Sequence, residues 1–354
     1  MMMMFSIAWI LVVLVVAWNN LDAAPTLYFY DAAATWTGGW QHSSLQNKTI
    51  WITGASSGIG ASMVCQALQA GAAHVILSSR KRDKLLNVAS KCQSLLGSKY
   101  HPEHTKMSIV PYDAANNSTT TMEATIVDRV WKACGDDPLD MVILNAGVYQ
   151  NQPAMLTTKQ ERDYVTRVNY QAPVDLTQAL LEKWKTHDNP KGHIVVVASI
   201  MAHGPYGLSS TYAASKAALR TYFWSLATEE SQWLTVNMAC PAATLTGFWN
   251  PVASTLHAGG SAMTADRVAH LILTGISGPY VLFYETWITK MPGILWLGLA
   301  HYTPGLFLAF SHFLAYIRVP IWYHERIDAM DVSLLMTRFV QIVMGQYPPV
   351  VVET

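Results

Sequence analysis

Short apolar runs rich in β-branched residues recur along the middle of the chain, with longer stretches of helical spacing between them. The clear runs are KTIWITG, HVILSSR, MSIVPYD, DMVILNAG, GHIVVVAS and LTVNMACP, and YVLFYE is a weaker one. Near-continuous apolar strands that alternate with helices are typical of a parallel sheet buried on both faces. Because crossovers between parallel strands are right-handed, this pattern predicts an α/β fold of the Rossmann type, with a doubly wound parallel sheet of about seven strands.

The first 18 residues, MMMMFSIAWILVVLVVAW, carry no charged side chain. As a helix they would be about 27 Å long, close to the thickness of the hydrocarbon core of a bilayer. A signal peptide is the alternative, but this segment lacks a basic start and fits the small residues of a cleavage site poorly. We therefore expect residues 1–21 to be a retained membrane anchor. Its orientation is not readable, because the first basic residue is Lys48.

The end of the chain is strongly apolar and aromatic, but Pro304-Gly305 interrupts it and neither half reaches about 18 uninterrupted apolar residues. Two short interfacial helices, or a lobe packed on the sheet or on a second subunit, both fit this pattern. The expected organisation is an anchor, a linker, a catalytic Rossmann domain and an apolar C-terminal tail, at residues 1–21, 22–46, 47–286 and 287–354.

The charge balance is even, with 23 basic and 23 acidic residues and no long run of either sign. This argues against a nucleic-acid partner and favours a small, weakly charged one. The cysteines form no CxxC pair, and no histidine near them gives the spacing of a zinc site. We therefore expect no metal site and four free thiols, Cys65, Cys92, Cys134 and Cys240.

The stretch TGASSGIG, residues 53–60, directly follows the first predicted strand and opens a helix that runs to about Ala70, with Gly71 as its stop. Glycines permit a tight turn here, let the backbone approach a pyrophosphate and allow close packing, and the helix start offers free N–H groups to phosphates. The predicted contacts are Gly54, Ser56, Ser57, Gly58, Ile59 and Gly60.

The end of the second predicted strand reads ILSSRKRDK, where an acidic residue would bind the ribose 2′-hydroxyl of NAD. Ser79 and Arg80 stand there instead, and an arginine can pair with a 2′-phosphate. The alternative is that this basic run only solvates the start of a helix. We expect NADP(H) as the preferred cofactor, with NAD(H) as the second choice.

Tyr212 and Lys216 stand four positions apart in SSTYAASKAALR, so one helical turn brings both side chains to the same face. Upstream, the chain also has NAG at 145–147, Asn169 in TRVNYQA and Ser199 in VVVASI, 13 residues before the tyrosine. In this order and spacing, residues 48 to about 285 resemble the classical short-chain dehydrogenase/reductase family. The anchor and the tail from ETWITKMP look most like its membrane-anchored dehydrogenase/reductase and 11-beta-hydroxysteroid dehydrogenase-like members.

The resemblance implies a catalytic set of Asn169, Ser199, Tyr212 and Lys216. A carbonyl that gains hydride needs a proton, and a phenol of pKa about 10 is a poor donor or acceptor at neutral pH. Lys216 and a positive nicotinamide should lower the pKa of Tyr212, which makes this residue the acid/base. Ser199 would orient the carbonyl, Asn169 would hold a relay water, and Lys216 would also bond the nicotinamide ribose.

Further cofactor contacts follow from the same resemblance. Asp113 matches the position that reaches the adenine, and PAATLTGFW matches the stretch beside the nicotinamide, although Ala242 replaces its usual glycine. Residues 247–262 would form a substrate lid. The implied contacts in these places are Asp113, Asn145, Ala146, Gly147, Thr244 and Thr246, beside Tyr212 and Lys216.

These observations lead to one main hypothesis, a membrane-anchored NADP(H)-dependent oxidoreductase that interconverts a secondary alcohol and a carbonyl. The expected substrate is lipophilic, such as a steroid, a retinoid or a lipid, and the expected location is the endoplasmic reticulum membrane, in contact with membrane lipid. A homodimer is expected by resemblance alone. The alternatives are a non-catalytic cofactor-binding scaffold, or a secreted or lumenal enzyme glycosylated at the sequons of Asn47, Asn116 and Asn117.

Overall fold

The computed structural model describes the central part of the chain, at residues 45–97, 105–116, 120–135, 137–187, 190–204, 207–248, 262–277 and 285–289. The expected anchor, nearly all of the linker, most of the lid and the tail from residue 290 lie outside the described residues, as does Asn117. None of the helices in the described part combines the length and the hydropathy that crossing a bilayer requires.

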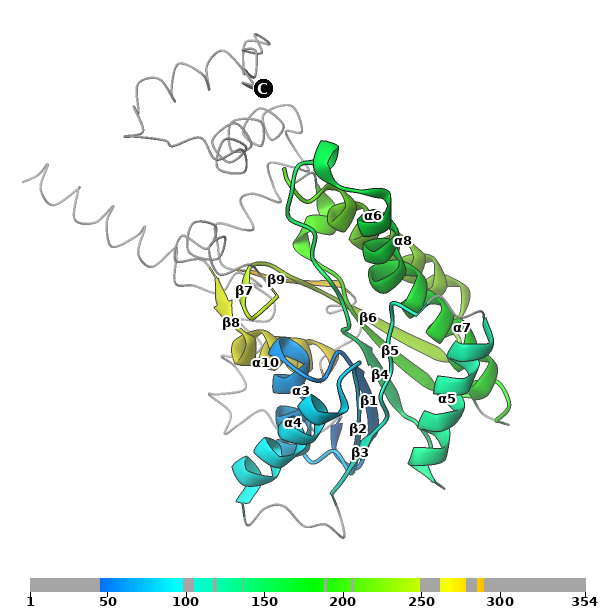
Figure 1. Ribbon diagram of the computed structural model, residues 1–354. Helices are drawn as coiled ribbons and strands as arrows, with labels where there is room; N and C mark the ends of the chain where they lie inside the picture. Colours follow the sequence, from blue (N-terminus) through cyan, green and yellow to red (C-terminus); the bar gives the residue numbers. More distant parts are fainter. Residues whose placement is uncertain are drawn as a thin grey trace, which may run out of the picture.

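Seven parallel strands form one sheet, in the order β3-β2-β1-β4-β5-β6-β9 (Figure 1). This confirms the predicted doubly wound sheet. A separate two-stranded ribbon joins β7 (Thr244–Leu245) to β8 (Met263–Thr264). The strands of the main sheet are β1 (Thr49–Thr53), β2 (His74–Ser78), β3 (Lys106–Ile109), β4 (Met141–Leu144), β5 (Gly192–Val197), β6 (Leu234–Pro241) and β9 (Glu285–Ile288).

Two layers of helices cover the sheet (Figure 1). Alternate residues of a strand face opposite layers, so Ile50 and Ile52 pack on one side and Trp51 packs on the other. Full burial of a side chain such as Trp51 contributes roughly 2 to 3 kcal/mol to folding. The layer on the side of Ile50 holds α3 (Gly58–Gln69), α4 (Arg82–Leu96) and α10 (Ala265–Ser277), and the opposite layer holds α5 (Thr120–Cys134), α7 (Ala172–Trp184) and α8 (Ser210–Glu229).

Shorter elements follow β4 and β5 and lead into α7 and α8. They are η3 (Ala154–Leu156), α6 (Lys159–Thr166), η4 (Arg167–Gln171) and η5 (Ile200–His203). The strand order reverses at β1, because β2 and β4 lie on opposite sides of it. In open parallel sheets, the crevice outside the carboxyl ends at such a reversal is where ligands bind.

The helix that follows the glycine turn has the predicted bounds. It ends at Gln69, and Gly71 follows with a φ of +89°, a left-handed conformation that suits glycine. At the start of α10, the Thr264 hydroxyl accepts a hydrogen bond from the Arg267 backbone N–H at 3.2 Å. Thr264 is therefore the N-cap of this helix.

The seventh strand is β9, which pairs with β6 from Met238 opposite Glu285 to Pro241 opposite Ile288. Of the predicted run YVLFYE, only Glu285 lies in this strand, and residues 280–284 lie outside the described part of the chain. The sheet continues beyond residue 286, where we expected the domain to end, because residues 287 and 288 still pair with Cys240 and Pro241 of β6.

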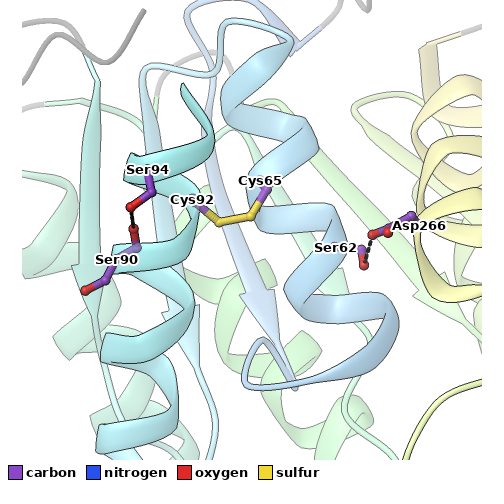
Figure 2. Close-up of a disulfide and its surroundings, with 6 residues drawn as sticks. All are labelled: Ser62, Cys65, Ser90, Cys92, Ser94 and Asp266. Atoms are coloured by element: carbon purple, nitrogen blue, oxygen red, sulfur yellow. Dashed lines mark hydrogen bonds between the residues drawn. A yellow bond between two sulfur atoms is a disulfide. The ribbon is translucent and has the colours of Figure 1, made fainter. Parts of the chain in front are cut away.

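The prediction of four free thiols is wrong, since Cys65 in α3 and Cys92 in α4 form a disulfide (Figure 2). The two residues are 27 positions apart, a separation that carries no signal of pairing by itself. They meet because α3 and α4 lie side by side on the same face of the sheet, with the Cα atoms 4.9 Å apart. Cys134 and Cys240 are free, as predicted, and both are buried.

Candidate active site

A cavity of roughly 840 Å³ opens at the carboxyl ends of the strands. Its wall is made by the glycine turn, the residues that follow β2, β4, β5 and β6, and the first turns of α8. Every site residue expected from the sequence lines this cavity except Gly60 and Asn169, which lie directly behind the wall. The elements that the sequence pattern singled out therefore converge on one place.

The glycine turn is held by tight backbone packing. Gly54 and Gly58 have φ values of +68° and +55°, which side-chain-bearing residues rarely adopt. A Cβ on Gly60 would lie 2.3 Å from the Gly54 carbonyl oxygen, closer than any real contact. The turn thus brings its backbone to the cavity, with the N-terminus of α3 beside it.

Asn145 fastens β4 to the glycine turn. Its Nδ2 donates to the Thr53 carbonyl oxygen at 3.1 Å, and the Thr53 hydroxyl oxygen accepts from the backbone N–H groups of Asn145 and Ala146 at 3.0 and 3.1 Å. Both residues line the cavity, as does Gly147. The geometry of this corner is therefore set by β1 and β4 together.

The end of β2 presents a basic and hydroxyl-bearing wall. Arg80 is exposed, and its Nη1 donates to the Tyr164 hydroxyl at 3.1 Å. The Ser79 Oγ is buried and has no hydrogen-bond partner among the described residues. Lys84, in the first turn of α4, also lines the cavity. The sequence reasoning passed over Lys84, although its place four residues after Arg80 in RKRDK was a usable signal.

This wall fits a phosphate group, because an unpaired buried hydroxyl and two cationic side chains face the same space. Asp113, at the neighbouring turn, lines the cavity as well. Its Oδ1 accepts from the Ala115 backbone N–H at 3.0 Å, so the side chain also stabilises its own turn. The residues present are consistent with a phosphorylated nucleotide at this end of the cavity.

Tyr212 and Lys216 project from one face of α8 and are both buried, with 6% and 4% of their surface exposed. Lys216 Nζ donates to the Val197 carbonyl oxygen at the end of β5, at 2.8 Å. Ser199 follows two residues later, and its Oγ donates to the Pro241 carbonyl oxygen at 3.5 Å. The hydrogen bond of Lys216 thereby joins α8 to the end of β5, next to Ser199.

Asn169 lies in a π-helical turn, η4, between α6 and α7. Its side chain brackets the Val148 peptide groups: Oδ1 accepts from the Val148 N–H at 2.8 Å and Nδ2 donates to its carbonyl oxygen at 2.9 Å. A Cβ on Gly147 would lie 3.4 Å from Asn169 Oδ1 and 3.7 Å from Lys216 Nζ. Both side chains therefore meet behind this glycine. Single π turns are frequent at functional sites.

Burial dominates the protonation of the two α8 residues. It raises the pKa of the Tyr212 hydroxyl far above its usual value, although a hydrogen bond with Ser199 lowers this pKa in part. Burial also lowers the pKa of Lys216 to about 8. We expected Lys216 and a positive nicotinamide to lower the pKa of Tyr212, but among the described residues the largest effect on this pKa is the desolvation of the phenol, which raises it. The chain's own groups therefore keep Tyr212 protonated at neutral pH.

The stretch after β6 closes the cavity over the glycine turn. A Cβ on Gly58 would lie 3.0 Å from the Thr246 Cγ2, so this threonine faces the turn. Thr244 Oγ1 donates to the Ala242 carbonyl oxygen at 3.0 Å, and both residues line the cavity. Ala242 replaces the usual glycine without a cost in pairing, since its N–H donates to the Ile288 carbonyl oxygen at 2.8 Å.

An aromatic wall made by Tyr149, Tyr212 and Phe248 stands beside the catalytic candidates. The ring centres of Tyr149 and Tyr212 are 4.9 Å apart, and those of Tyr149 and Phe248 are 5.9 Å apart. Tyr149 and Phe248 also line the cavity. The sequence reasoning did not select these two residues, because a single aromatic residue in a loop has no periodic pattern.

Comparison with known proteins gives a consistent result. A family model described as short chain dehydrogenase matches residues 48–257. Human dehydrogenase/reductase SDR family member 7 is 28% identical over 281 residues, which cover 77% of this chain and 78% of that protein. The 11-beta-hydroxysteroid dehydrogenase-like 3 of Arabidopsis thaliana is 31% identical over 209 residues, which cover 59% of this chain and 62% of the relative.

Solved structures show the same fold. A short chain dehydrogenase from Burkholderia cenocepacia, in complex with NADP, has a TM-score of 0.58 at 27% identity and covers 69% of this chain and 97% of its own. A short-chain dehydrogenase from Sphingobium yanoikuyae, in complex with NADPH, has a TM-score of 0.57 at 21% identity and covers 81% of this chain and 99% of its own.

Proposed function

The chain belongs to the short-chain dehydrogenase family and is an NAD(P)-dependent oxidoreductase, and on this premise we propose that it interconverts a secondary alcohol and a carbonyl, with Tyr212 as acid/base and NADP(H) as preferred cofactor. The observation that carries the proposal is the convergence of Ser199, Tyr212 and Lys216 on one cavity wall. A scaffold that only bound a nucleotide would have no need for a buried, protonated phenol beside a serine hydroxyl.

The chemistry divides between cofactor and protein. The bound nicotinamide supplies or accepts the hydride. For reduction, the Ser199 hydroxyl donates a hydrogen bond to the substrate carbonyl oxygen, and Tyr212 transfers its phenolic proton to the same oxygen as negative charge develops there. Lys216, held by the Val197 carbonyl oxygen, keeps an ammonium group close to the phenol. Asn169 fixes the Val148 backbone behind them, which supports a relay that returns the proton to Tyr212.

The NADP(H) preference rests on the wall at the end of β2. Arg80, Lys84 and the unpaired Ser79 hydroxyl would hold a ribose 2′-phosphate there. The glycine turn and the N-terminus of α3 would hold the pyrophosphate. Asp113 would reach the adenine, and Thr244 and Thr246 would contact the nicotinamide side, as the sequence resemblance implies.

The substrate we propose is a lipophilic alcohol or carbonyl of the steroid, retinoid or lipid kind. Tyr149 and Phe248 give the cavity an aromatic wall next to Tyr212, and the apolar segments at both ends of the chain suit supply from a membrane. The name of the Arabidopsis relative, which refers to hydroxysteroids, agrees with this direction.

We further propose that residues 1–21 anchor the protein in the endoplasmic reticulum membrane, ahead of a linker (22–46), the catalytic domain (47–286) and a membrane-associated tail (287–354). The Cys65–Cys92 disulfide supports a lumenal catalytic domain, because structural disulfides persist in oxidising compartments. Asn47 is exposed at the amino end of β1, at the edge of the sheet opposite the cavity. A glycan there would leave the site open. The domain is also proposed to form a homodimer.

The test of the activity is a panel of lipophilic ketones and alcohols, followed by nicotinamide absorbance with NADPH and with NADH. We expect turnover with NADPH, and a loss of roughly 10³-fold or more in kcat for Tyr212→Phe, since general acid catalysis contributes about 10² to 10⁴. Full activity of Tyr212→Phe would remove the proposed acid/base. Carbonate extraction and glycosidase treatment of microsomes test the anchor and the lumenal side.

A further inference from the structure

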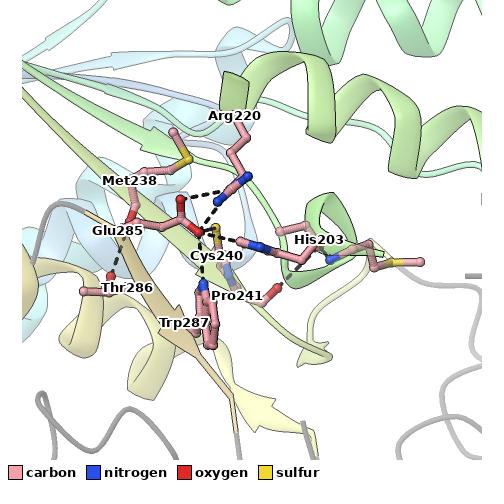
Figure 3. A network of polar contacts seen from close by, with 10 residues as sticks. His203, Arg220, Met238, Cys240, Pro241, Glu285, Thr286 and Trp287 are labelled. Carbon is pink, nitrogen blue, oxygen red and sulfur yellow. Dashed lines mark hydrogen bonds and ion pairs between the residues drawn. The ribbon is translucent and has the colours of Figure 1, made fainter. Parts of the chain in front are cut away.

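Glu285, the first residue of β9, has a buried carboxylate that contacts the side chains of three residues (Figure 3). Arg220 Nε donates to both of its oxygens, at 3.1 and 2.9 Å. His203 Nε2 lies 2.7 Å from Oε1, and Trp287 Nε1 donates to the same oxygen at 2.9 Å. Only 9% of the Glu285 side chain is exposed. This carboxylate is therefore shielded from water, and both of its oxygens contact side chains of the protein.

Two of the partners of Glu285, His203 and Arg220, belong to the elements that carry the catalytic candidates. His203 is the last residue of η5, and Ser199 is the N-cap of that helix. Arg220 stands on α8 one turn beyond Lys216, on the same face. Glu285 therefore joins the segment of Ser199 to the helix of Tyr212 and Lys216, from a strand that carries no catalytic candidate itself.

A third connection runs through β6. Cys240 Sγ lies 3.9 Å from Glu285 Oε1, and the thiol accepts a hydrogen bond from the Ser199 backbone N–H. The next residue, Pro241, provides the carbonyl oxygen that accepts from the Ser199 hydroxyl. Ser199 is thus fixed on two sides, by β6 at its own peptide and hydroxyl groups and by Glu285 at the far end of η5.

The carboxylate is held in its charged form. Burial opposes ionisation, but hydrogen bonds from His203 and Trp287 and the charges of His203 and Arg220 outweigh it, so the pKa of Glu285 is below its usual value. Burial, followed by the charge of Glu285, raises the pKa of the Cys240 thiol, which stays neutral. Arg220 is itself fixed, with its guanidinium 3.6 Å from the centre of the Trp224 ring.

The same cluster resembles a cation site, since His203, Cys240 and Glu285 offer ligand atoms that all lie within 4.8 Å of one another. The Arg220 guanidinium, however, already contacts both carboxylate oxygens and balances their charge. A divalent cation would have to displace it. The arrangement is therefore better described as a buried ion-pair network than as a metal centre.

We propose that Glu285 is a positioning residue, which sets the separation between Ser199 and the Tyr212–Lys216 pair by holding η5 and α8 to the edge of the sheet. This inference rests on the proposed function, in which both groups act on one substrate oxygen. Displacements of about 1 Å can reduce a rate by 10²-fold. Loss of the carboxylate removes the partner of both His203 and Arg220. As a result, η5 and α8 are no longer held to the same group on β9.

The first test compares Glu285→Gln with Glu229→Gln, an exposed position on the same helix as Tyr212. For Glu285→Gln we expect kcat for carbonyl reduction to fall by roughly 10- to 100-fold. The KM for NADPH should change by less than about twofold, because the wall at Arg80 lies at the other end of the cavity. Glu229→Gln should match the unchanged chain in both constants. An unaltered kcat in a folded Glu285→Gln protein contradicts the proposal.

The second test separates positioning from general stability. In a Ser199→Ala background, Glu285→Gln should lower kcat by less than about twofold, since the separation that Glu285 sets has no effect once the Ser199 hydroxyl is absent. If the loss of kcat in the double variant equals the product of the losses in the two single variants, Glu285 acts independently of Ser199 and the positioning role is wrong. If Glu285→Gln does not fold, His203→Gln removes only the link to η5 and should show the same coupling to Ser199→Ala.

The same assay keeps the two proposals apart. Wild-type activity in Tyr212→Phe would overturn the proposed function, whatever Glu285 does. A large loss in Tyr212→Phe beside no loss in Glu285→Gln would overturn the positioning role alone.

Discussion

Lys216 Nζ donates a 2.8 Å hydrogen bond to the Val197 carbonyl oxygen, which ties α8 to the end of β5. Burial of this ammonium group has already brought the pKa of Lys216 down to about 8. The strand carbonyl stabilises the charged form that burial disfavours. The lysine therefore stands near the point where a modest change of pH alters its charge.

This gives a pH prediction. The pKa of Lys216 is lowered, so the group loses its proton as pH rises through about 8, and the support it gives to Tyr212 disappears with the proton. We expect kcat for carbonyl reduction to be level below pH 8 and to decline above it. A profile of kcat from roughly pH 6 to 10 measures this.

The matched variant is Lys216→Arg, which stays charged throughout because a guanidinium has a pKa above about 12. Its rate is expected to be lower at every pH, since the flat group cannot reproduce the bond to Val197, but the decline near pH 8 should be absent. A decline at the same pH in this variant would assign the titration to another group.

Cofactor preference should depend on Arg80. Arg80→Gln removes a charge-assisted bond worth about 1.5 to 3 kcal/mol, so kcat/KM for NADPH should fall by roughly 10- to 150-fold while the value for NADH stays level. Arg82→Gln is the control, because Arg82 starts α4 but does not line the cavity. Equal losses in the two variants would mean that the basic run attracts the cofactor through its summed positive charge and that Arg80 makes no specific contact.

The glycine turn should not tolerate a methyl group at residue 60. In Gly60→Ala the new Cβ would meet the Gly54 carbonyl oxygen at 2.3 Å, and this backbone atom cannot move away cheaply. We expect at least a tenfold weaker binding of NADPH, measured by fluorescence titration, and a loss of roughly 2 kcal/mol or more in the free energy of unfolding.

Gly135→Ala serves as its comparison, since Gly135 has a φ of +72° but nothing within 4 Å of the added Cβ. It should cost about 1 kcal/mol of stability through backbone strain and leave NADPH binding unchanged. If both variants bind NADPH normally, the steric argument for the turn is wrong.

The disulfide should stabilise the catalytic domain. Replacing Cys65 and Cys92 together by alanine removes a cross-link that closes a loop of 27 residues, worth about 3 to 4 kcal/mol in the chain-entropy treatment. Denaturant melts with and without reductant measure it. Thiol titration of the denatured, unreduced chain should find two free thiols, Cys134 and Cys240, and four after reduction. Four thiols before reduction would contradict the bond.

The sheet was predictable because its signal is local. Runs such as DMVILNAG and GHIVVVAS are apolar on both faces, and each became a strand at the expected place. The cavity was predictable for a related reason, since parallel strands bring their carboxyl ends to one edge and the motif residues stand at those ends.

What the sequence could not supply is proximity between distant elements. Cys65 and Cys92 pair only because two helices happen to be neighbours on one face. Glu285, His203 and Arg220 come from three elements and follow no common spacing. The same holds for the protonation of Tyr212, because burial is the main cause that raises its pKa, and burial is a property of the packed molecule.

The π turn at η4 has a consequence for the whole length of its helix. It lies in a continuous helical run that carries Tyr164, the partner of Arg80, on one side and Asn169 in the turn itself. A π turn holds one residue more than an α turn, and each residue advances a helix by about 100°. Deleting a single residue there would rotate Tyr164 relative to Asn169 about the helix axis. Tyr164 could then no longer contact Arg80 while Asn169 contacts Val148, so the rotation of this one helix is shared by two separate walls of the cavity.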